Sequence, residues 1–149
     1  MISAFIFDFD GVIADTETVW LETIWDFSKR NGLDIPFETL EDYVGDGDTG
    51  MMELLAARLG SKQMRDSLYS ELKEAFRRRT EGLGPRDGVL SYLDFAKRNG
   101  IKLACASNSA RSYIELWLTK LGLSERFEVT VTRSEVGTAN LKPRPGIYI

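Results

Sequence analysis

The sequence predicts an α/β fold whose parallel-sheet core is interrupted, after its first strand, by a block of helices. Residues 2–8 (ISAFIFD) form a near-continuous apolar run, which is typical of a strand in a parallel sheet. Residues 15–80 show helical spacing of apolar side chains with no strand-like alternation. Beyond residue 88, helical segments alternate with short apolar strands, as in a parallel α/β sheet.

The first strand is expected to be buried on both faces, and four helices are expected in the block that follows it. The first helix starts at an N-cap, Asp15 or Thr16, and ends at Gly32 after two basic residues. The other three are expected after Pro36, over about residues 49–59 and over residues 62–80.

A turn-rich stretch at residues 82–88 (GLGPRDG) separates this block from the resumed core. The elements expected beyond it are a helix from Val89 to Gly100, a strand at residues 101–106, a helix at 110–121 and a strand at 127–132. We therefore expect a discontinuous core of residues 1–14 and 83–149, with residues 15–82 as a helical insertion.

Composition excludes several functional classes. The 149 residues include no histidine, which removes Ser-His-Asp and Cys-His catalysis and histidine-ligated zinc. A net charge of −4 disfavours a general nucleic-acid binder, and no apolar run is long enough for a membrane span. The single cysteine, Cys105, cannot form an internal disulfide, which favours a cytoplasmic location. Any chemistry must use carboxylates, hydroxyls and lysines, with or without a metal.

The sharpest local signal is DFDG, residues 8–11, where the first strand ends. Ligands of open parallel sheets bind at the carboxyl ends of strands, and a turn at Gly11 would bring Asp8 and Asp10 toward one ligand. The structural alternative is a strand end followed by an Asx-type turn. A calcium loop is excluded, because the twelfth position counted from Asp8 is Val19 instead of glutamate.

Two further signals follow later strands. Ser107-Asn108-Ser109 offers hydroxyls and helix N-terminal amides to an anionic oxygen, unless Ser109 serves only as an N-cap. Lys142 stands beside prolines, which restrain the backbone and could hold one ammonium in place. Taken alone, a lysine before a proline is usually part of a surface loop.

Taken together, an acid pair, a hydroxyl turn and a lysine after successive strands resemble the haloacid dehalogenase superfamily of phosphohydrolases. The resemblance is to members with a helical cap inserted after the first core strand, and is closest to the group of β-phosphoglucomutase and phosphoglycolate-phosphatase-like enzymes. It covers essentially the whole chain: DFDGVIADTE, the helical insertion, the turn at 84–88, CASNS and LKPRPGIYI. It implies a Rossmann-like core, with residues 15–82 as the cap.

The resemblance also implies a mechanism for a small phosphorylated metabolite such as a sugar phosphate. Asp8 would attack phosphorus, and Asp10 would be the general acid and then the general base. Lys142 would offset negative charge, while Ser107 and the amide of Asn108 would hold a phosphoryl oxygen. Mg²⁺ would bind Asp8 and the backbone carbonyl of Asp10.

The chain departs from the family in one respect. Its members carry a fourth motif, an acidic loop after a further core strand, that completes the magnesium site; the sequence stops at Ile149, before it. The resemblance therefore implies a core that is incomplete at the C-terminus. We expect weak or no turnover, and self-association through the unpaired first strand.

Three residues of the cap are candidates for contacting substrate. Asp46 and Asp48 lie in an acidic, glycine-rich loop, whose structural interpretation is a solvated turn. Trp20 could stack on a sugar, although packing between cap helices is the more common role of such a residue. The family's mutases place a histidine near Trp20, which favours a phosphatase over a phosphomutase. The run at residues 77–79 is best interpreted as a solvated helix face.

Two other classes remain open at this point. A receiver-like phosphoacceptor also uses acids at a strand end with a hydroxyl and a lysine, but it inserts no long helical block after the first strand. A non-catalytic regulatory or interaction fragment could retain the fold without the metal site. Dehalogenation is disfavoured, because the family's dehalogenases lack the acid/base that Asp10 would supply.

Overall fold

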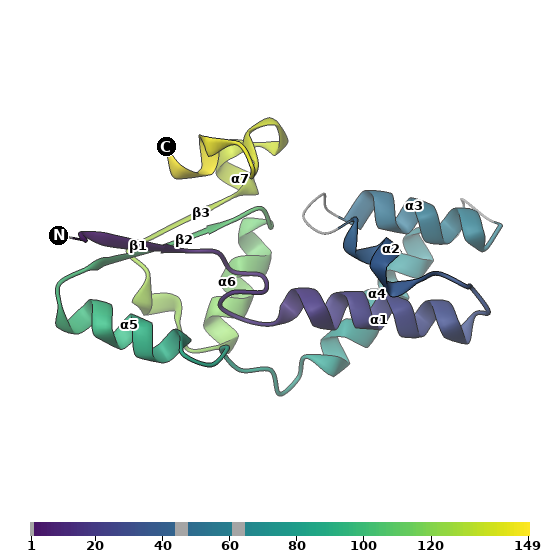
Figure 1. Cartoon of the computed structure of the whole chain (residues 1–149), viewed down its shortest axis with the longest axis horizontal. Helices are drawn as coiled ribbons and strands as arrows, with labels where there is room; N and C mark the ends of the chain where they lie inside the picture. Colours follow the sequence, from purple (N-terminus) through teal and green to yellow (C-terminus); the bar gives the residue numbers. More distant parts are fainter. Residues whose placement is uncertain (1, 44–47, 61–64) are drawn as a thin grey trace. The chain divides into compact units, whose positions relative to one another are not determined.

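The computed structural model describes residues 2–43, 48–60 and 65–149. The chain folds as two compact units (Figure 1). Met1–Asp15 together with Gly84–Ile149 form one of them, called here the sheet unit. Thr16–Leu83 form the other, the helical unit. Among the described residues, no helix combines the length and the apolar character needed to cross a bilayer.

The sheet unit contains a parallel three-stranded sheet in the order β1-β2-β3, which confirms the predicted α/β class. The strands are β1 (Ala4–Phe7), β2 (Lys102–Ser107) and β3 (Val129–Thr132). Phe7 pairs with Cys105, and Ser107 pairs with Thr132. The three carboxyl ends therefore lie at one edge of the sheet, where a ligand site is expected.

Two amphipathic helices, α5 (Val89–Arg98) and α6 (Arg111–Lys120), lie on one face of this sheet (Figure 1). Each buries side chains three or four positions apart, as a helix on a core does. The buried side chains are Val89, Leu93 and Ala96 of α5, and Ile114, Trp117 and Leu118 of α6. The remaining elements are η2 (Ser124–Arg126), α7 (Arg133–Val136), η3 (Thr138–Asn140) and η4 (Pro145–Tyr148).

The prediction that the first strand is buried on both faces is wrong. Along β1 the side chains alternate between exposed and half-buried, and Ile6 is 54% exposed. Phe5 points to the face that carries α5, where its ring meets the ring of Tyr92 at 6.3 Å between centroids. Ile6 points to the opposite face, because successive side chains of a strand alternate. Among the described residues, β1 also has only one neighbouring strand, β2.

The helical unit contains the four predicted helices. They are α1 (Thr16–Arg30), α2 (Phe37–Glu41), α3 (Asp48–Arg58) and α4 (Arg65–Arg79). Among the described residues, their apolar faces and Ile35, which lies between α1 and α2, form one core of ten buried side chains: Leu21, Ile24, Phe27, Ile35, Leu40, Met51, Met52, Leu55, Leu68 and Leu72. This unit has its own core, so its helices do not depend on the sheet for burial.

Candidate active site

The polar side chains that the sequence predicts to be functional in the sheet unit lie together at the carboxyl ends of the three strands. Asp8 directly follows β1, and Ser107 is the last residue of β2. Lys142 lies beyond β3 and reaches back to both of these segments. Segments far apart in the sequence therefore meet at one edge of the sheet.

Asp8 and Lys142 form an ion pair. The ammonium Nζ of Lys142 lies 2.8 Å from Oδ1 of Asp8, and it also donates to the carbonyl oxygen of Ala106 at 2.6 Å. The Lys142 side chain is only 19% exposed, whereas that of Asp8 is 41% exposed. The ammonium is thus held by two acceptors, one of which is the charged carboxylate. Lys142 is thus not part of a free surface loop.

Asn108 positions Lys142 through its side chain. Its Nδ2 donates to the carbonyl oxygen of Lys142 at 3.2 Å, and its Oδ1 accepts the backbone N–H of Lys142 at 2.9 Å. This two-point contact resembles the pairing of two strands and fixes the backbone from which the lysine projects. The Asn108 side chain is therefore occupied, and its backbone amide remains the group expected to meet a phosphoryl oxygen.

Asp10 is held by hydroxyl groups from the segment that follows β2. Oδ2 of Asp10 accepts the hydroxyl of Ser109 at 2.7 Å, and Oδ1 accepts the phenol of Tyr113 at 3.2 Å. The hydroxyl of Ser107 lies 3.4 Å from Oδ2 and accepts the backbone N–H of Ser109 at 3.0 Å. Both carboxylate oxygens of Asp10 therefore have defined partners.

Tyr113 is a site residue that the sequence reasoning missed, and Ser109, expected in the hydroxyl turn, has a partner that the sequence did not indicate. The interpretation of Ser109 as an N-cap is wrong: the N-cap of α6 is Ala110, and no side chain caps it. The hydroxyl of Ser109 binds Asp10 instead. No local pattern signals either contact, because Asp10 lies 99 positions from Ser109 and 103 positions from Tyr113 in the sequence.

The turn that carries Asp10 is fixed by backbone hydrogen bonds. Gly11 adopts a φ of 72°, and its N–H donates to the carbonyl oxygen of Ala14 at 2.8 Å. A positive φ of this kind is strained for most other residues, so the turn requires glycine there. Phe9 and Ile13 are fully buried beneath the turn, and the backbone N–H of Arg86 donates to the carbonyl of Ile13 at 2.8 Å. The two acids thus sit on an anchored loop.

The hydroxyl turn after β2 is anchored to the segment after β3. The backbone N–H of Arg133 donates to the carbonyl of Ser109 at 3.1 Å. Thr132 caps α7, and the Glu135 carboxylate accepts its N–H at 2.8 Å. The Arg111 guanidinium at 2.6 Å, followed by the hydrogen bonds from Thr132, lowers the pKa of Glu135 to about 2. This set of contacts joins α6, α7 and the site.

Cys105 lies in the strand beneath the site and is not a nucleophile there. Its side chain is fully buried. Burial first, and then the negative charge of Asp8, raise the pKa of the Cys105 thiol to about 12. Because the thiolate is the reactive form, the protonated thiol is inert at neutral pH.

Asp8 and Asp10 are the carboxylates available for a metal at this edge of the sheet. Within the described parts of the chain, no cluster of three or more acidic or cysteine side chains could hold a metal ion. Magnesium in phosphoryl-transfer sites usually keeps several waters and takes one or two protein carboxylates plus substrate phosphate. A half-exposed Asp8 with Asp10 two residues away meets that minimum and no more.

Trp20 is the one of the three substrate-contact candidates in the helical unit whose side chain the structure describes. Trp20 packs edge-on against Tyr69 and Phe76 of α4, with its ring centroid 5.5 Å from that of Phe76. Its environment is therefore the packing between α1 and α4. Asp46 lies outside the described residues, and so does the side chain of Asp48, although its backbone starts α3.

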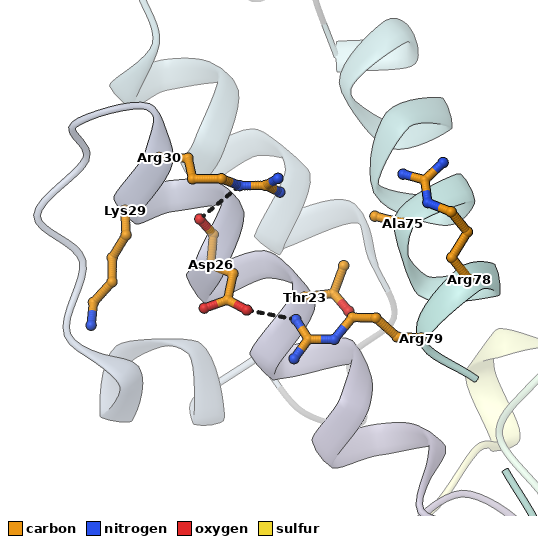
Figure 2. Close-up of a pocket in the computed structure, with 7 residues that line it drawn as sticks. All are labelled: Thr23, Asp26, Lys29, Arg30, Ala75, Arg78 and Arg79. Atoms are coloured by element: carbon orange, nitrogen blue, oxygen red, sulfur yellow. Dashed lines mark hydrogen bonds and ion pairs between the residues drawn. The ribbon is translucent and has the colours of Figure 1, made fainter. Parts of the chain in front are cut away.

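A hollow of about 470 Å³ lies between α1 and α4, and its lining is mostly basic (Figure 2). The lining residues are Thr23, Asp26, Lys29, Arg30, Ala75, Arg78 and Arg79. Arg79 bridges Asp26 at 2.7 Å and Glu22 at 3.2 Å, and Lys29 lies over the ring of Trp25. Arg79 therefore joins α4 to α1, whereas Lys29 contacts an aromatic ring of its own helix.

Comparison with known families gives one match along nearly the whole chain. The model of the family described as haloacid dehalogenase-like hydrolase matches residues 5–149. YhcW of Bacillus subtilis (strain 168) is 34% identical over 151 residues, covering 100% of this chain and 67% of YhcW. The phosphorylated carbohydrates phosphatase of Thermotoga maritima is 30% identical over 152 residues, covering 99% of this chain and 68% of that protein.

Solved structures show the same fold. The crystal structure of β-phosphoglucomutase from Clostridium difficile aligns with a TM-score of 0.70 and 28% sequence identity. The alignment covers 99% of this chain and 68% of that one. The similarity thus extends over both the sheet unit and the helical unit.

Proposed function

Because this chain belongs to the haloacid dehalogenase-like hydrolase family, we propose that it is a magnesium-dependent phosphatase of a small phosphorylated carbohydrate. The observation that carries the proposal is the ion pair of Asp8 with Lys142 beside Asp10, at the carboxyl edge of the sheet. The name of the Thermotoga maritima relative supports the substrate class. A buried cysteine without a disulfide partner supports a cytoplasmic location.

Asp8 is the proposed nucleophile. Its Oδ1 accepts the Phe9 N–H at 2.7 Å and the Lys142 ammonium at 2.8 Å. Oδ2 is then the oxygen that attacks phosphorus, since it has no partner in the described part of the chain. The new bond joins Oδ2 to phosphorus, the bond from phosphorus to the ester oxygen breaks, and an aspartyl phosphate results.

Asp10 is the proposed proton donor and acceptor. In the first step its carboxyl group gives a proton to the leaving ester oxygen, which departs as an alcohol. In the second step its carboxylate takes a proton from water, whose oxygen attacks phosphorus, so that phosphate leaves and Asp8 is regenerated. The tether from Ser109 at 2.7 Å supports a fixed placement of this group.

Charge stabilisation supplies much of the catalysis in phosphoryl transfer. Lys142 is proposed to offset the negative charge that gathers on Asp8 and the phosphoryl oxygens. Ser107 and the backbone amide of Asn108 are proposed to hold one phosphoryl oxygen, for which the Ser107 hydroxyl must turn from Asp10. The Asp8 carboxylate and the backbone carbonyl of Asp10 would hold Mg²⁺, which when bound would neutralise further phosphoryl charge.

The test is hydrolysis of 4-nitrophenyl phosphate with and without Mg²⁺. Turnover of the 149-residue chain is expected to be weak. Whatever turnover it has should depend on Mg²⁺ and be abolished by Asp8→Asn, while Asp87→Asn, which changes an exposed acid in the turn before α5, leaves it unchanged. A version of the chain extended by a family-type acidic loop is assayed in parallel. Turnover by the extended version alone would show that two carboxylates are too few for the metal. Measurable turnover by the wild type that Asp8→Asn retains in full would overturn the proposal.

A second candidate function is a non-catalytic regulatory or interaction domain. This function is favoured by the small number of metal-binding side chains at the site. Among the described residues, no three acidic or cysteine side chains lie close enough together to hold a metal ion. A calorimetric titration with Mg²⁺ separates the two functions. Saturable binding that Asp8→Asn removes supports the enzyme, and absence of binding, together with no turnover, supports the interaction domain.

A phosphomutase is a further alternative within the family. The Clostridium difficile neighbour carries that name. The sequence has no histidine, whereas mutases of the family place one near the position of Trp20, and this favours the phosphatase. Incubation of a sugar 1-phosphate would give free sugar from a phosphatase, and the isomeric sugar 6-phosphate from a mutase.

A further inference from the structure

Tyr113 reaches the candidate site from the first turn of α6. Its phenol oxygen lies 3.2 Å from Oδ1 of Asp10, while the hydroxyl of Ser109 lies 2.7 Å from Oδ2. The two donors come from one short segment and approach different oxygens of the same carboxylate. A carboxylate held at both oxygens cannot rotate about its side-chain bonds without losing a hydrogen bond.

The ring of Tyr113 is fixed independently of its hydroxyl. It meets the fully buried ring of Phe9 edge-on, at 6.4 Å between centroids and an interplanar angle of 82°. It also contacts the ring of Trp117, four residues along the same helix, at 6.3 Å. Aromatic contacts of this kind do not need the phenol oxygen. Replacing tyrosine by phenylalanine therefore removes the donor and leaves the packing.

Phe9 and Asp10 are neighbours on the turn after β1, and Tyr113 touches both. The ring packs on Phe9, which anchors the turn, and the hydroxyl binds Asp10, which the turn presents. The same side chain thus sets the distance between α6 and the turn and the direction of the carboxylate. Proton transfer depends steeply on such placement, because the donor must lie within hydrogen-bond reach of the leaving oxygen.

We propose that Tyr113 is a positioning residue that, together with Ser109, fixes the carboxyl group of Asp10 for proton transfer to the leaving oxygen of the substrate. The inference rests on the proposed phosphatase function and adds a residue to it. Tyr113 acts through the carboxyl group of Asp10 and is not itself the proton donor. Loss of the Tyr113 hydroxyl should therefore slow the hydrolysis of esters whose leaving group needs a proton, and should have little effect on esters whose leaving group does not.

Leaving groups of different basicity provide the test. An alkyl phosphate such as 2-glycerophosphate needs its leaving oxygen protonated, whereas 4-nitrophenolate departs with little help. The comparison uses kcat/KM, which reports the steps up to loss of the leaving group. Positioned acids contribute about 10²–10⁴-fold, so we expect Tyr113→Phe to lower kcat/KM by about tenfold for 2-glycerophosphate and by less than about threefold for 4-nitrophenyl phosphate. Asp10→Asn should show the same selectivity with a larger amplitude.

Matched controls separate positioning from a structural role. Tyr92→Phe removes the hydroxyl of an exposed tyrosine on α5 and should leave kcat/KM unchanged for both substrates. Ser109→Ala should resemble Tyr113→Phe, and Ser109→Thr, which keeps a hydroxyl, should restore the wild-type ratio. An equal loss of kcat/KM on both substrates, or no loss on either, would overturn the inference.

A second measurement tests the positioning role of Tyr113 without requiring enzymatic turnover. Three-bond NMR couplings across χ1 of Asp10 report whether its side chain occupies one rotamer or several. We expect a single rotamer in the wild type and averaged couplings in Tyr113→Phe. Unchanged couplings in the variant would contradict a positioning role, whether or not the chain is active. A wild-type chain that hydrolyses neither ester would count against the phosphatase function alone.

Discussion

Lys142 is the residue on which the charge balance of the proposed site depends. Its ammonium is mostly shielded from water and touches the carboxylate of Asp8 and the carbonyl of Ala106. Removing one preorganised charge of this kind typically costs about 10²–10³-fold in kcat. We expect Lys142→Met to lower kcat on 4-nitrophenyl phosphate by about that factor, because Asp8 would then meet a dianionic substrate without a neighbouring cation.

The control for this prediction is Lys97→Met, which removes an exposed lysine from α5 in the same unit. It should leave both kcat and KM at the wild-type values. Circular dichroism of each variant checks that the fold survives. If Lys142→Met kept a kcat within about threefold of the wild type, electrostatic stabilisation by this lysine would be ruled out.

At the scale of elements, Glu135 joins the start of α7 to α6. Its carboxylate accepts the N–H of Thr132 at 2.8 Å and the guanidinium of Arg111 at 2.6 Å. We expect Glu135→Gln to lower the free energy of unfolding by about 1 kcal/mol at pH 7, the usual cost of weakening a helix cap. Water screens the pair of Arg111 and Glu135, because the Glu135 side chain is 38% exposed, so the ion pair stabilises the fold less than its short distance suggests.

The dependence of this effect on pH follows from the lowered pKa. The folded chain holds the pKa of Glu135 at about 2, below the ordinary value of 4.5. The stabilisation is therefore complete above about pH 4.5 and is lost as the pH falls toward 2. Urea unfolding at pH 7 and pH 3 should show a smaller difference between wild type and Glu135→Gln at the lower pH. Glu128→Gln, at an exposed position beside β3, should have the same free energy of unfolding as the wild type at both pH values.

The sequence predicted the elements well because each has a strong local cause. Periodic apolar side chains and terminal glycines specified the helices of both units. The apolar pattern could not tell whether both faces of β1 are buried, because a run such as ISAFIFD fits a fully buried strand and a half-exposed strand equally well. It also placed Ser109 in the wrong role, because a serine before a helix is usually its cap. The partner that binds Ser109 is Asp10, 99 positions away, which no local pattern reveals.

The candidate site shows the same division between local and distant information. Its three motifs were visible because strand ends, turns and prolines leave local signatures. Tyr113 carried no such signature, since a tyrosine in an amphipathic helix is most simply explained by packing. Its packing is real, against Phe9 and Trp117, and the hydrogen bond to Asp10 exists only because α6 docks against the turn after β1.

At the scale of the whole molecule, the sheet unit carries one edge that invites association. In the described part of the chain, β1 pairs with β2 alone, and the apolar Ile2 and Ile6 are 65% and 54% exposed. A strand edge with exposed apolar side chains is a template for pairing with a second chain. We expect the chain of this sequence to self-associate, with a weight-average mass that rises with concentration in light scattering coupled to gel filtration.

Charge on that strand should prevent the association. Lysine on an edge strand blocks pairing, because its ammonium would have to leave water in the interface. We therefore expect Ile6→Lys to shift the protein to monomer at concentrations where the wild type is associated. Leu116→Lys alters an equally apolar and 67% exposed side chain on α6, away from the strand, and should leave the association unchanged. A wild-type chain that is monomeric at every concentration, or a Leu116→Lys variant that dissociates as fully as Ile6→Lys, would show that β1 is not the surface through which the chains meet.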